Sequence, residues 1–323
     1  MRPVARILAA AALLPSLMAC AAGAGGPVKN GFDLANATVP PEEIHQGGPP
    51  RDGIPAIDDP RFIAADEARW LAPEDRVLAV VRRGEAKAYP IRILNWHEVV
   101  NDRIAERPIV VTYCPLCGSG MVFNTGEAGS GLTFGVSGLL YNSDLLLYDR
   151  QTESLWSQIQ GKAIAGPRKG ERLAMMPATH TTWSDWRQRH PDTRVLSRDT
   201  GYRRHYSRSP YAGYADSRSL YFPVSNRDRR YHPKEQIIGL EIDGRAKAYP
   251  FVDLARAEGQ RIEDRFAGRE LTIRFDAEDR TGRILDAGGD VIPTSTMYWF
   301  AWAAFHPDTA VYSPSAGGEP SGL

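Results

Sequence analysis

The sequence lacks three features that would place it in a familiar class: an excess of charge of one sign, a set of paired cysteines, and an apolar run long enough to span a bilayer. Lysine plus arginine and aspartate plus glutamate number 39 each, so no overall field attracts nucleic acid or an anionic membrane. Three cysteines in 323 residues cannot form a disulfide framework. No phosphate-binding loop, dinucleotide fingerprint, His-Glu-x-x-His or Gly-x-Ser-x-Gly motif occurs.

What is present is an ordinary globular composition with an export signal. The hydrophobic share of 42% and the charged share of 24% exclude a disordered or collagen-like chain. Two arginines, an apolar stretch over residues 7–17 and Leu-Met-Ala-Cys at 17–20 resemble the start of a bacterial lipoprotein. This predicts a signal peptide over residues 1–19 and a lipidated Cys20. Ala21 in place of aspartate favours the periplasmic face of the outer membrane, and an ordinary secretory signal is the alternative.

An internal repeat sets the predicted domain organisation. Residues 84–90 recur as 244–250, residues 102–107 as 264–269, and the Trp-x-x-Trp…His-Pro-Asp-Thr segment at 183–193 recurs at 299–309. We therefore expect a flexible linker over 20–53, repeat 1 with a Cys-x-x-Cys insertion over 54–201, an inter-repeat loop over 202–233, repeat 2 over 234–315, and a tail over 316–323.

Both copies show the same local patterns. Each begins with a β-branched run and a glycine-containing turn, which predicts a hairpin, and each carries two tryptophans three residues apart, which predicts a short helix. The fold class predicted is α+β and β-rich, with internally duplicated sheet units and short helices. Because both copies keep the second tryptophan, we expect Trp186 and Trp302 to be buried.

Only the first copy has the segment that contains Cys114 and Cys117. Cys-x-x-Cys spacing brings two sulfur atoms together, as a reducible pair or as two ligands for a metal. The following Gly-Ser-Gly and the strand-like run at 121–123 favour a turn between two strands over a thioredoxin-type helix. A second cysteine pair is missing, which excludes a four-cysteine zinc site within one chain. A structural disulfide is the plain alternative.

Several side chains near the cysteines in the sequence are candidate partners. His97 is absent from the second copy and precedes the cysteine strand, so it could lower a thiol pKa, carry protons or be a third ligand; a histidine hydrogen-bonded in the core is the alternative. A pocket is predicted from polar and aromatic residues, namely Trp96, Glu98, Tyr141, Asn142, Asp144, Trp156 and Gln158. Aspartate and asparagine also build turns without lining a pocket.

Four segments together closely resemble a bacterial and archaeal family catalogued as domain of unknown function number 3179. They are residues 86–98, 113–120, 134–144 and 154–158, and the resemblance covers about residues 54–315. The family name supplies no activity. Some relatives are selenoproteins, so the resemblance implies redox use of the Cys-Pro-Leu-Cys position.

The sequence therefore predicts an exported, lipid-anchored protein with thiol-based redox activity at Cys114 and Cys117, assisted by His97. As an enzyme it would be a thiol oxidoreductase acting on a small-molecule or protein thiol, without nucleic acid. The first alternative is a periplasmic protein or chaperone that binds one copper or zinc ion through the same three residues. The second is a non-catalytic binding module with a stapled turn.

Overall fold

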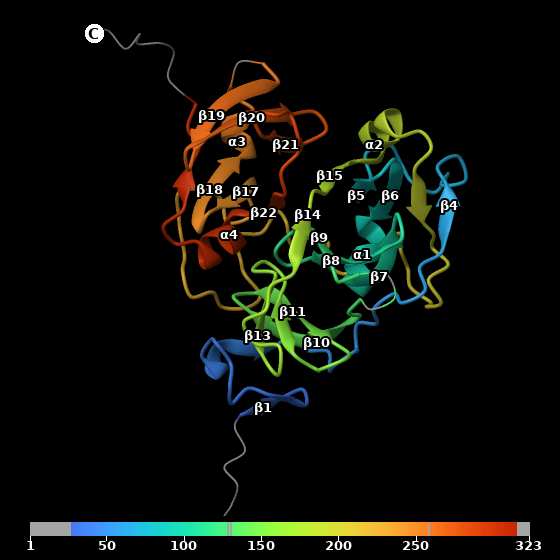
Figure 1. Ribbon diagram of the computed structural model, residues 1–323, viewed down its shortest axis with the longest axis vertical. Helices are drawn as coiled ribbons and strands as arrows, with labels where there is room; N and C mark the ends of the chain where they lie inside the picture. Colours follow the sequence, from blue (N-terminus) through green and yellow to red (C-terminus); the bar gives the residue numbers. More distant parts are fainter. Residues whose placement is uncertain (1–26, 128, 130, 258, 315–323) are drawn as a thin grey trace, which may run out of the picture.

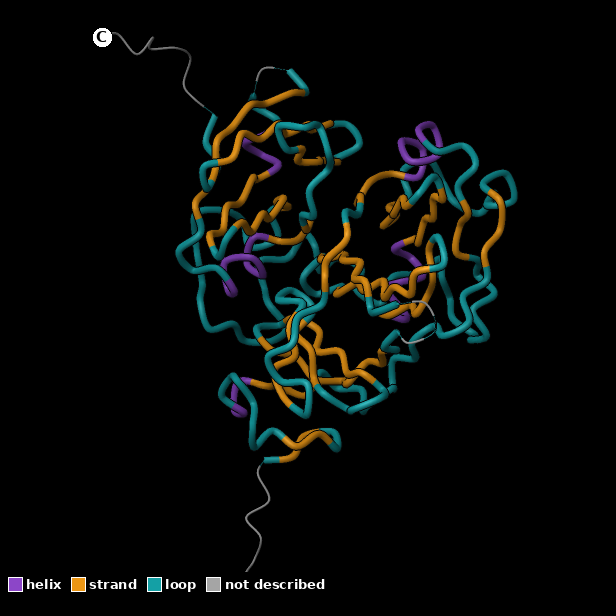
Figure 2. Tube along the Cα trace, viewed as in Figure 1, coloured by secondary structure: helices purple, strands orange, loops and turns teal. Residues whose placement is uncertain are grey.

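The computed structural model describes residues 27–127, 129, 131–257 and 259–314, so the expected signal peptide, Cys20 and the 316–323 tail lie outside the described residues. Figure 2 shows that strands dominate and that the helices are few and short, which confirms the predicted β-rich class. The chain forms three lobes (Figure 1). Among the described residues, no helix combines the length and apolar character needed to cross a bilayer.

The first unit is built on five strands: β4 (Phe62–Ala64), β5 (Arg76–Arg82), β6 (Glu85–Pro90), β15 (Thr179–Thr182) and β16 (Arg194–Leu196). Their order in the sheet is β15–β5–β6–β16–β4. Neighbouring strands are antiparallel except β6 and β16, which run parallel. Helix α1 (Ile91–His97) follows β6, and helix α2 (Trp183–Arg189) follows β15.

The second unit shows the same arrangement. Its strands are β17 (Gln236–Ile242), β18 (Arg245–Pro250), β22 (Ser295–Tyr298) and β23 (Ala310–Val311). The order β22–β17–β18–β23, with two antiparallel pairings and one parallel pairing, matches β15–β5–β6–β16. Helix α3 (Phe251–Leu254) follows β18, and helix α4 (Trp299–Phe305) follows β22.

The second tryptophan of each helix holds the following strand in the same way. The indole N–H of Trp186 donates to Thr193 Oγ1 at 3.0 Å, and that of Trp302 donates to Thr309 Oγ1 at 2.8 Å. Both rings are buried, with 1% and 3% of their surface exposed, as predicted. Each indole thus contributes apolar burial and also satisfies its one polar atom inside the core.

A continuous sheet joins the two units. Strands β7 (Val99–Ile104), β8 (Arg107–Cys114) and β9 (Ser119–Asn124) extend the second unit in the order β23–β18–β17–β22–β9–β8–β7, and β14 (Ala174–Met176) also pairs with β9. The join is the pairing of Thr296 with Gly120. A separate three-stranded sheet belongs to the second unit and contains β19 (Arg261–Phe266), β20 (Arg269–Asp276) and β21 (Thr281–Leu285).

The third lobe comes from the segment that only the first unit has. Its strands are β10 (Phe134–Tyr141), β11 (Asp144–Asp149), β12 (Leu155–Ser157) and β13 (Lys162–Ala165). They form the order β13–β12–β11–β10–β3, where β3 (Ile44–Gln46) comes from the N-terminal region. Figure 1 shows this lobe below the other two, against the blue N-terminal chain.

The structure differs from the flexible linker expected over residues 20–53, because its described part, 27–53, is folded. It contains β1 (Val28–Lys29), β2 (Phe32–Asp33), the 3-10 helix η1 (Pro41–Glu43) and β3. Leu34 and Ile44 are fully buried against the third lobe. Strands of two or three residues carry too little alternation to stand out among prolines and glycines, so the composition misled the prediction.

One hydrophobic cluster lies where the three lobes meet. It contains both cysteines, Trp156 of the third lobe, and Trp299 and Trp302 of the second unit. The two thiols are therefore part of a core that all three lobes build.

Candidate functional site

The two cysteines lie on the turn between β8 and β9, as predicted for a turn between strands. Cys114 is the last residue of β8 and pairs with Ser119, so Cys117 lies in the connecting turn. Gly118 has a φ of 60°, in the left-handed region, and a Cβ at this position would lie 2.9 Å from Cζ of Tyr298. Glycine is therefore required here both by the backbone conformation and by the tyrosine ring packed on the turn.

A second hairpin turn, between β10 and β11, brings a carboxylate to the thiols. Asn142 and Ser143 form its two central residues with φ values of 52° and 63°, which is the tight turn that favours asparagine. Asp144 follows as the first residue of β11. The carbonyl oxygen of Ser143 accepts from Cys117 Sγ at 3.3 Å and from Cys114 Sγ at 3.7 Å.

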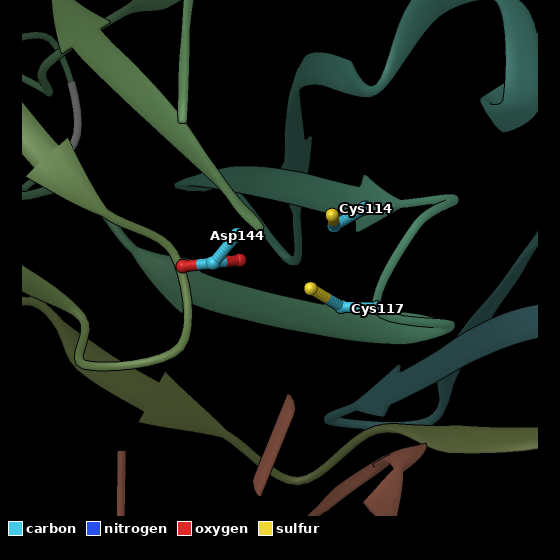
Figure 3. Close-up of side chains that lie close together, drawn as sticks. All are labelled: Cys114, Cys117 and Asp144. Atoms are coloured by element: carbon cyan, nitrogen blue, oxygen red, sulfur yellow. The ribbon is translucent and has the colours of Figure 1, made fainter. Parts of the chain in front are cut away.

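Figure 3 shows the three side chains converging from the two turns. Both sulfur atoms and one carboxylate oxygen of Asp144 lie within 4.8 Å of one another. The cysteines are free thiols, and all three residues are 0–1% exposed. We call Cys114, Cys117 and Asp144 the thiol–carboxylate site.

Only one of the two oxygens of the Asp144 carboxylate has hydrogen-bond partners. Its Oδ2 atom accepts from Ile159 N at 3.0 Å and from Ser157 Oγ at 3.2 Å, whereas Oδ1 is buried without a hydrogen-bond partner. Burial raises the pKa of Asp144 to about 7, despite the hydrogen bonds that oppose this shift. The carboxylate is thus fixed in orientation, with one oxygen left for another ligand.

The thiols share this unfavourable environment for negative charge. Burial raises the pKa of Cys117 well above its usual value, and Cys114, Asp144 and Glu98 add to the shift. Two thiolates and a carboxylate cannot all be ionised here unless protons or a cation compensate them.

Glu98 contributes a second buried carboxyl group to this environment. It ends α1 in the left-handed conformation, with a φ of 58°, and is 6% exposed. Tyr211 OH donates to its Oε1 at 3.4 Å. Burial, with a smaller contribution from the negative charge of Asp144, raises the pKa of Glu98 to about 8.

His97, expected beside the thiols, has both ring nitrogens engaged elsewhere. Nδ1 lies 2.8 Å from the carbonyl oxygen of Pro55, and Nε2 lies 2.7 Å from Tyr206 OH. Burial lowers the pKa of His97 to about 4, against the opposing effect of Pro55. The group that joins the thiols is therefore the Asp144 carboxylate and not this imidazole.

Gln158 and Trp156 of the predicted pocket lie inside the core behind the cysteine turn. Gln158 Oε1 accepts from Ser119 Oγ at 2.7 Å, and its Nε2 donates to Thr112 Oγ1 and to the Ser119 carbonyl, both at 3.1 Å. These bonds tie the turn between β8 and β9 to the third lobe. The Trp156 indole donates to Asp149 Oδ2 at 2.9 Å.

Trp96, Tyr141 and Asn142 make other contacts around the site. The Trp96 indole donates to the Arg208 carbonyl at 3.0 Å, and the Tyr141 ring packs edge-on against Phe305. Asn142 Oδ1 accepts from Ser225 N at 2.7 Å. The structure thus brings Glu98 and Asp144 of the predicted pocket into the electrostatic environment of the thiols.

The expected inter-repeat loop, residues 202–233, is the element whose role sequence reasoning missed. Three of its residues form hydrogen bonds around the site. Tyr206 bonds to His97 and Tyr211 bonds to Glu98. The carbonyl of Phe222 accepts from Ser143 Oγ at 2.8 Å. We call residues 202–233 the cover segment. Its six tyrosines are the available signal, because so many aromatic residues are unusual in a solvated loop.

Comparison with known proteins agrees with the sequence resemblance. A family model described as a protein of unknown function (DUF3179) matches residues 51–290. No curated protein and no solved structure matches the chain. The matched segment includes the cysteine turn, Asp144 and the whole cover segment. The chain therefore belongs to the DUF3179 family of proteins of unknown function.

Proposed function

We propose that the protein binds a metal ion, preferably zinc, through Cys114, Cys117 and Asp144. The proposal rests on one observation: two sulfur atoms and a carboxylate oxygen converge within 4.8 Å in a buried place. Buried groups that repel one another when ionised are costly unless a cation compensates them. Asp144 Oδ1, which has no hydrogen-bond partner, supplies a free donor atom for such a cation.

The donor set favours zinc over copper(I). Zinc accepts thiolate sulfur and carboxylate oxygen in one tetrahedral site, whereas copper(I) selects soft sulfur donors. Three protein donors leave a fourth position for a ligand from outside the chain, an arrangement typical of catalytic zinc sites. Because burial raises the pKa of Cys117, metal uptake should release protons and should strengthen as the pH rises.

Thiol redox chemistry at Cys114 and Cys117 is the second candidate. Its support is the free cysteine pair at Cys-x-x-Cys spacing, both of whose thiols donate to the Ser143 carbonyl. A raised pKa leaves little reactive thiolate, and full burial keeps a protein thiol from reaching the sulfur atoms. These two features place redox exchange behind metal binding.

The deciding experiment is metal analysis of protein purified without chelator, combined with a thiol count before and after mild reductant. We expect one zinc ion per chain and two thiols that resist alkylation until the metal is removed. Asp144→Asn should weaken zinc binding at least about tenfold, and Cys117→Ser should abolish it. Glu98→Gln is the control, because it removes a neighbouring buried carboxyl without removing a proposed ligand.

The opposite pattern would favour the second candidate. Protein without metal, whose two thiols change reversibly to a disulfide under mild oxidation, would contradict the zinc site and support redox use. Zinc affinity unchanged in Asp144→Asn would remove the carboxylate from the proposed ligand set.

For localisation, we propose that the chain is exported and held by lipid on Cys20 at the periplasmic face of the outer membrane. The support is the Leu-Met-Ala-Cys segment with Ala21 after it. The thiol–carboxylate site would then work in an oxidising compartment, where a bound metal would also protect two adjacent thiols from oxidation.

We also propose that the two units arose by internal duplication. Support comes from the shared strand order and from a repeated polar contact inside each unit. Lys87 and Tyr89 bind the carboxylate of Asp102, with Tyr89 OH 2.6 Å from Oδ2. The second unit repeats this contact, with residues Lys247, Tyr249 and Asp264.

A further inference from the structure

A cavity of about 370 Å³ lies between the two units, away from the thiols. One wall is α2 of the first unit, and the other is the three-stranded sheet of the second unit. Four arginines line it, one from each of these elements: Arg189 from α2, Arg261 from β19, Arg274 from β20 and Arg283 from β21.

Three of these arginines form a row across the sheet. Arg261 pairs directly with Arg274, and Arg274 pairs directly with Arg283. Like charges in directly opposed positions destabilise a sheet. Burial lowers the pKa of Arg283, and the positive charges of Arg189 and Arg274 add to the effect.

The carboxylates nearby neutralise only part of this charge. Arg189 is bound by Asp185, and Arg261 Nε lies 2.6 Å from Glu263 Oε1. Among the described residues, Arg274 and Arg283 have no side-chain hydrogen bond or ion pair. The remaining lining carboxylate, Asp276, accepts from the backbone N–H groups of residues 278 and 279.

A neutral donor in the same wall also lacks a partner. Thr281 lines the cavity, is 9% exposed, and has a buried hydroxyl without a hydrogen bond. The Asp185 carboxylate, which binds Arg189, offsets part of the charge of Arg283. Two arginines without a side-chain hydrogen bond or ion pair and an unused hydroxyl thus surround one space at the joint between the units.

We propose that this cavity binds a phosphate group, free or as a small phosphate ester, through Arg274 and Arg283. Guanidinium groups present paired N–H donors that match the oxygen atoms of phosphate. A doubly charged oxyanion would remove the repulsion along the arginine row and would connect α2 of the first unit to the sheet of the second. This site is independent of the proposed metal site.

The test is calorimetric titration of the full mature chain with inorganic phosphate, at ionic strength held constant with chloride. We expect saturable binding at one site, weakened at least about tenfold by Arg274→Gln or Arg283→Gln and abolished by both together. Arg265→Gln is the matched control, since Arg265 lies on β19, pairs with Glu270 and does not line the cavity. Its phosphate affinity should equal that of the wild type.

Thermal melting of the same variants without phosphate gives a second measurement. Relative to Arg265→Gln, each cavity variant should melt at a higher temperature, because it removes one member of the repelling row. The proposal would be overturned if the wild type showed no saturable phosphate binding. It would also be overturned if the variant with both arginines replaced still bound phosphate. Tighter binding of succinate than of phosphate would overturn the assignment to phosphate. Zinc content should be unaffected in all variants.

Discussion

Replacing Asp144 with asparagine should stabilise the metal-free protein at high pH while it weakens zinc binding, because both effects come from one buried charge. Burial raises the pKa of Asp144 to about 7, from the usual 3.8. Between these two pH values the folded protein keeps the proton that the unfolded chain has released, so stability falls as the pH rises through this window. At pH values above both pKa values, this difference in pKa lowers the free energy of unfolding by about 4 kcal/mol.

The assay is denaturant unfolding of wild type and Asp144→Asn in the presence of chelator at several pH values. The free energy of unfolding of Asp144→Asn, relative to that of the wild type, should increase by roughly 2–3 kcal/mol between about pH 5 and about pH 8. The asparagine oxygen can still accept from Ser157 and Ile159, so local geometry is preserved. An equal stability difference at both pH values would refute the reasoning, because it would show that no buried charge had been removed.

Asp149→Asn is the control for burial of an aspartate in the same strand. Its carboxylate accepts from the Trp156 indole and from Thr152, so its hydrogen bonds are satisfied. We expect this substitution to destabilise the protein without a gain at high pH. Zinc at one fixed concentration should then stabilise the wild type and the Asp149 variant equally, and should stabilise Asp144→Asn less, by at least about 1.4 kcal/mol.

Three further predictions concern other parts of the chain. Burial lowers the pKa of His97 from 6.5 to about 4, so the unfolded chain binds this proton first and stability falls as the pH drops from 6.5 to 4. His97→Gln should therefore remove up to about 3 kcal/mol of acid sensitivity, measured by unfolding across that range. Trp186→Ala and Trp302→Ala should each destabilise by about 3–5 kcal/mol, and much smaller losses would contradict their role as core residues. Cys20→Ser should release the protein from membranes into the soluble periplasmic fraction, and membrane association that survives the change would refute the lipid anchor.

The features predictable from the sequence were those fixed by local pattern. The hairpin before Tyr89, the short helix around Trp186 and the turn at Gly118 each depend on alternation, helical spacing or glycine within a few residues. The folded region before residue 54 was missed because β3 pairs with β10, about a hundred residues away, and only that pairing makes Ile44 a core residue.

The candidate site could likewise be predicted only where a local sequence pattern determines it. Asp144 was recognised only as one of several polar residues near a turn, because no local rule says which side chain of a hairpin faces the neighbouring lobe. His97 was expected at the thiols because it precedes their strand. Its partners, the Pro55 carbonyl and Tyr206 OH, come from segments on either side in the sequence, and the cover segment that supplies Tyr206 has no regular pattern.

The way the two units hold each other explains why the thiol–carboxylate site needs both. The hairpin of the first unit pairs Cys114 with Ser119, and the corresponding hairpin of the second pairs Asp276 with Thr281. Tyr298 N of the second unit donates to the Cys117 carbonyl at 2.8 Å, which fixes the cysteine turn from outside its own unit.

The first unit fixes the other hairpin turn in return. Arg76 of β5 donates to the carbonyls of Asp279 and Arg280. Thr182, which pairs with Arg76 and ends β15 as Tyr298 ends β22, donates to the Asp279 carboxylate. Each unit therefore contacts the hairpin turn of the other unit, and the two turns carry different side chains. Soft sulfur donors and a carboxylate gather at one turn, and unpaired arginines lie beside the other. Two units with the same strand order and reciprocal contacts thus frame the two sites that we propose, one for a cation and one for an anion.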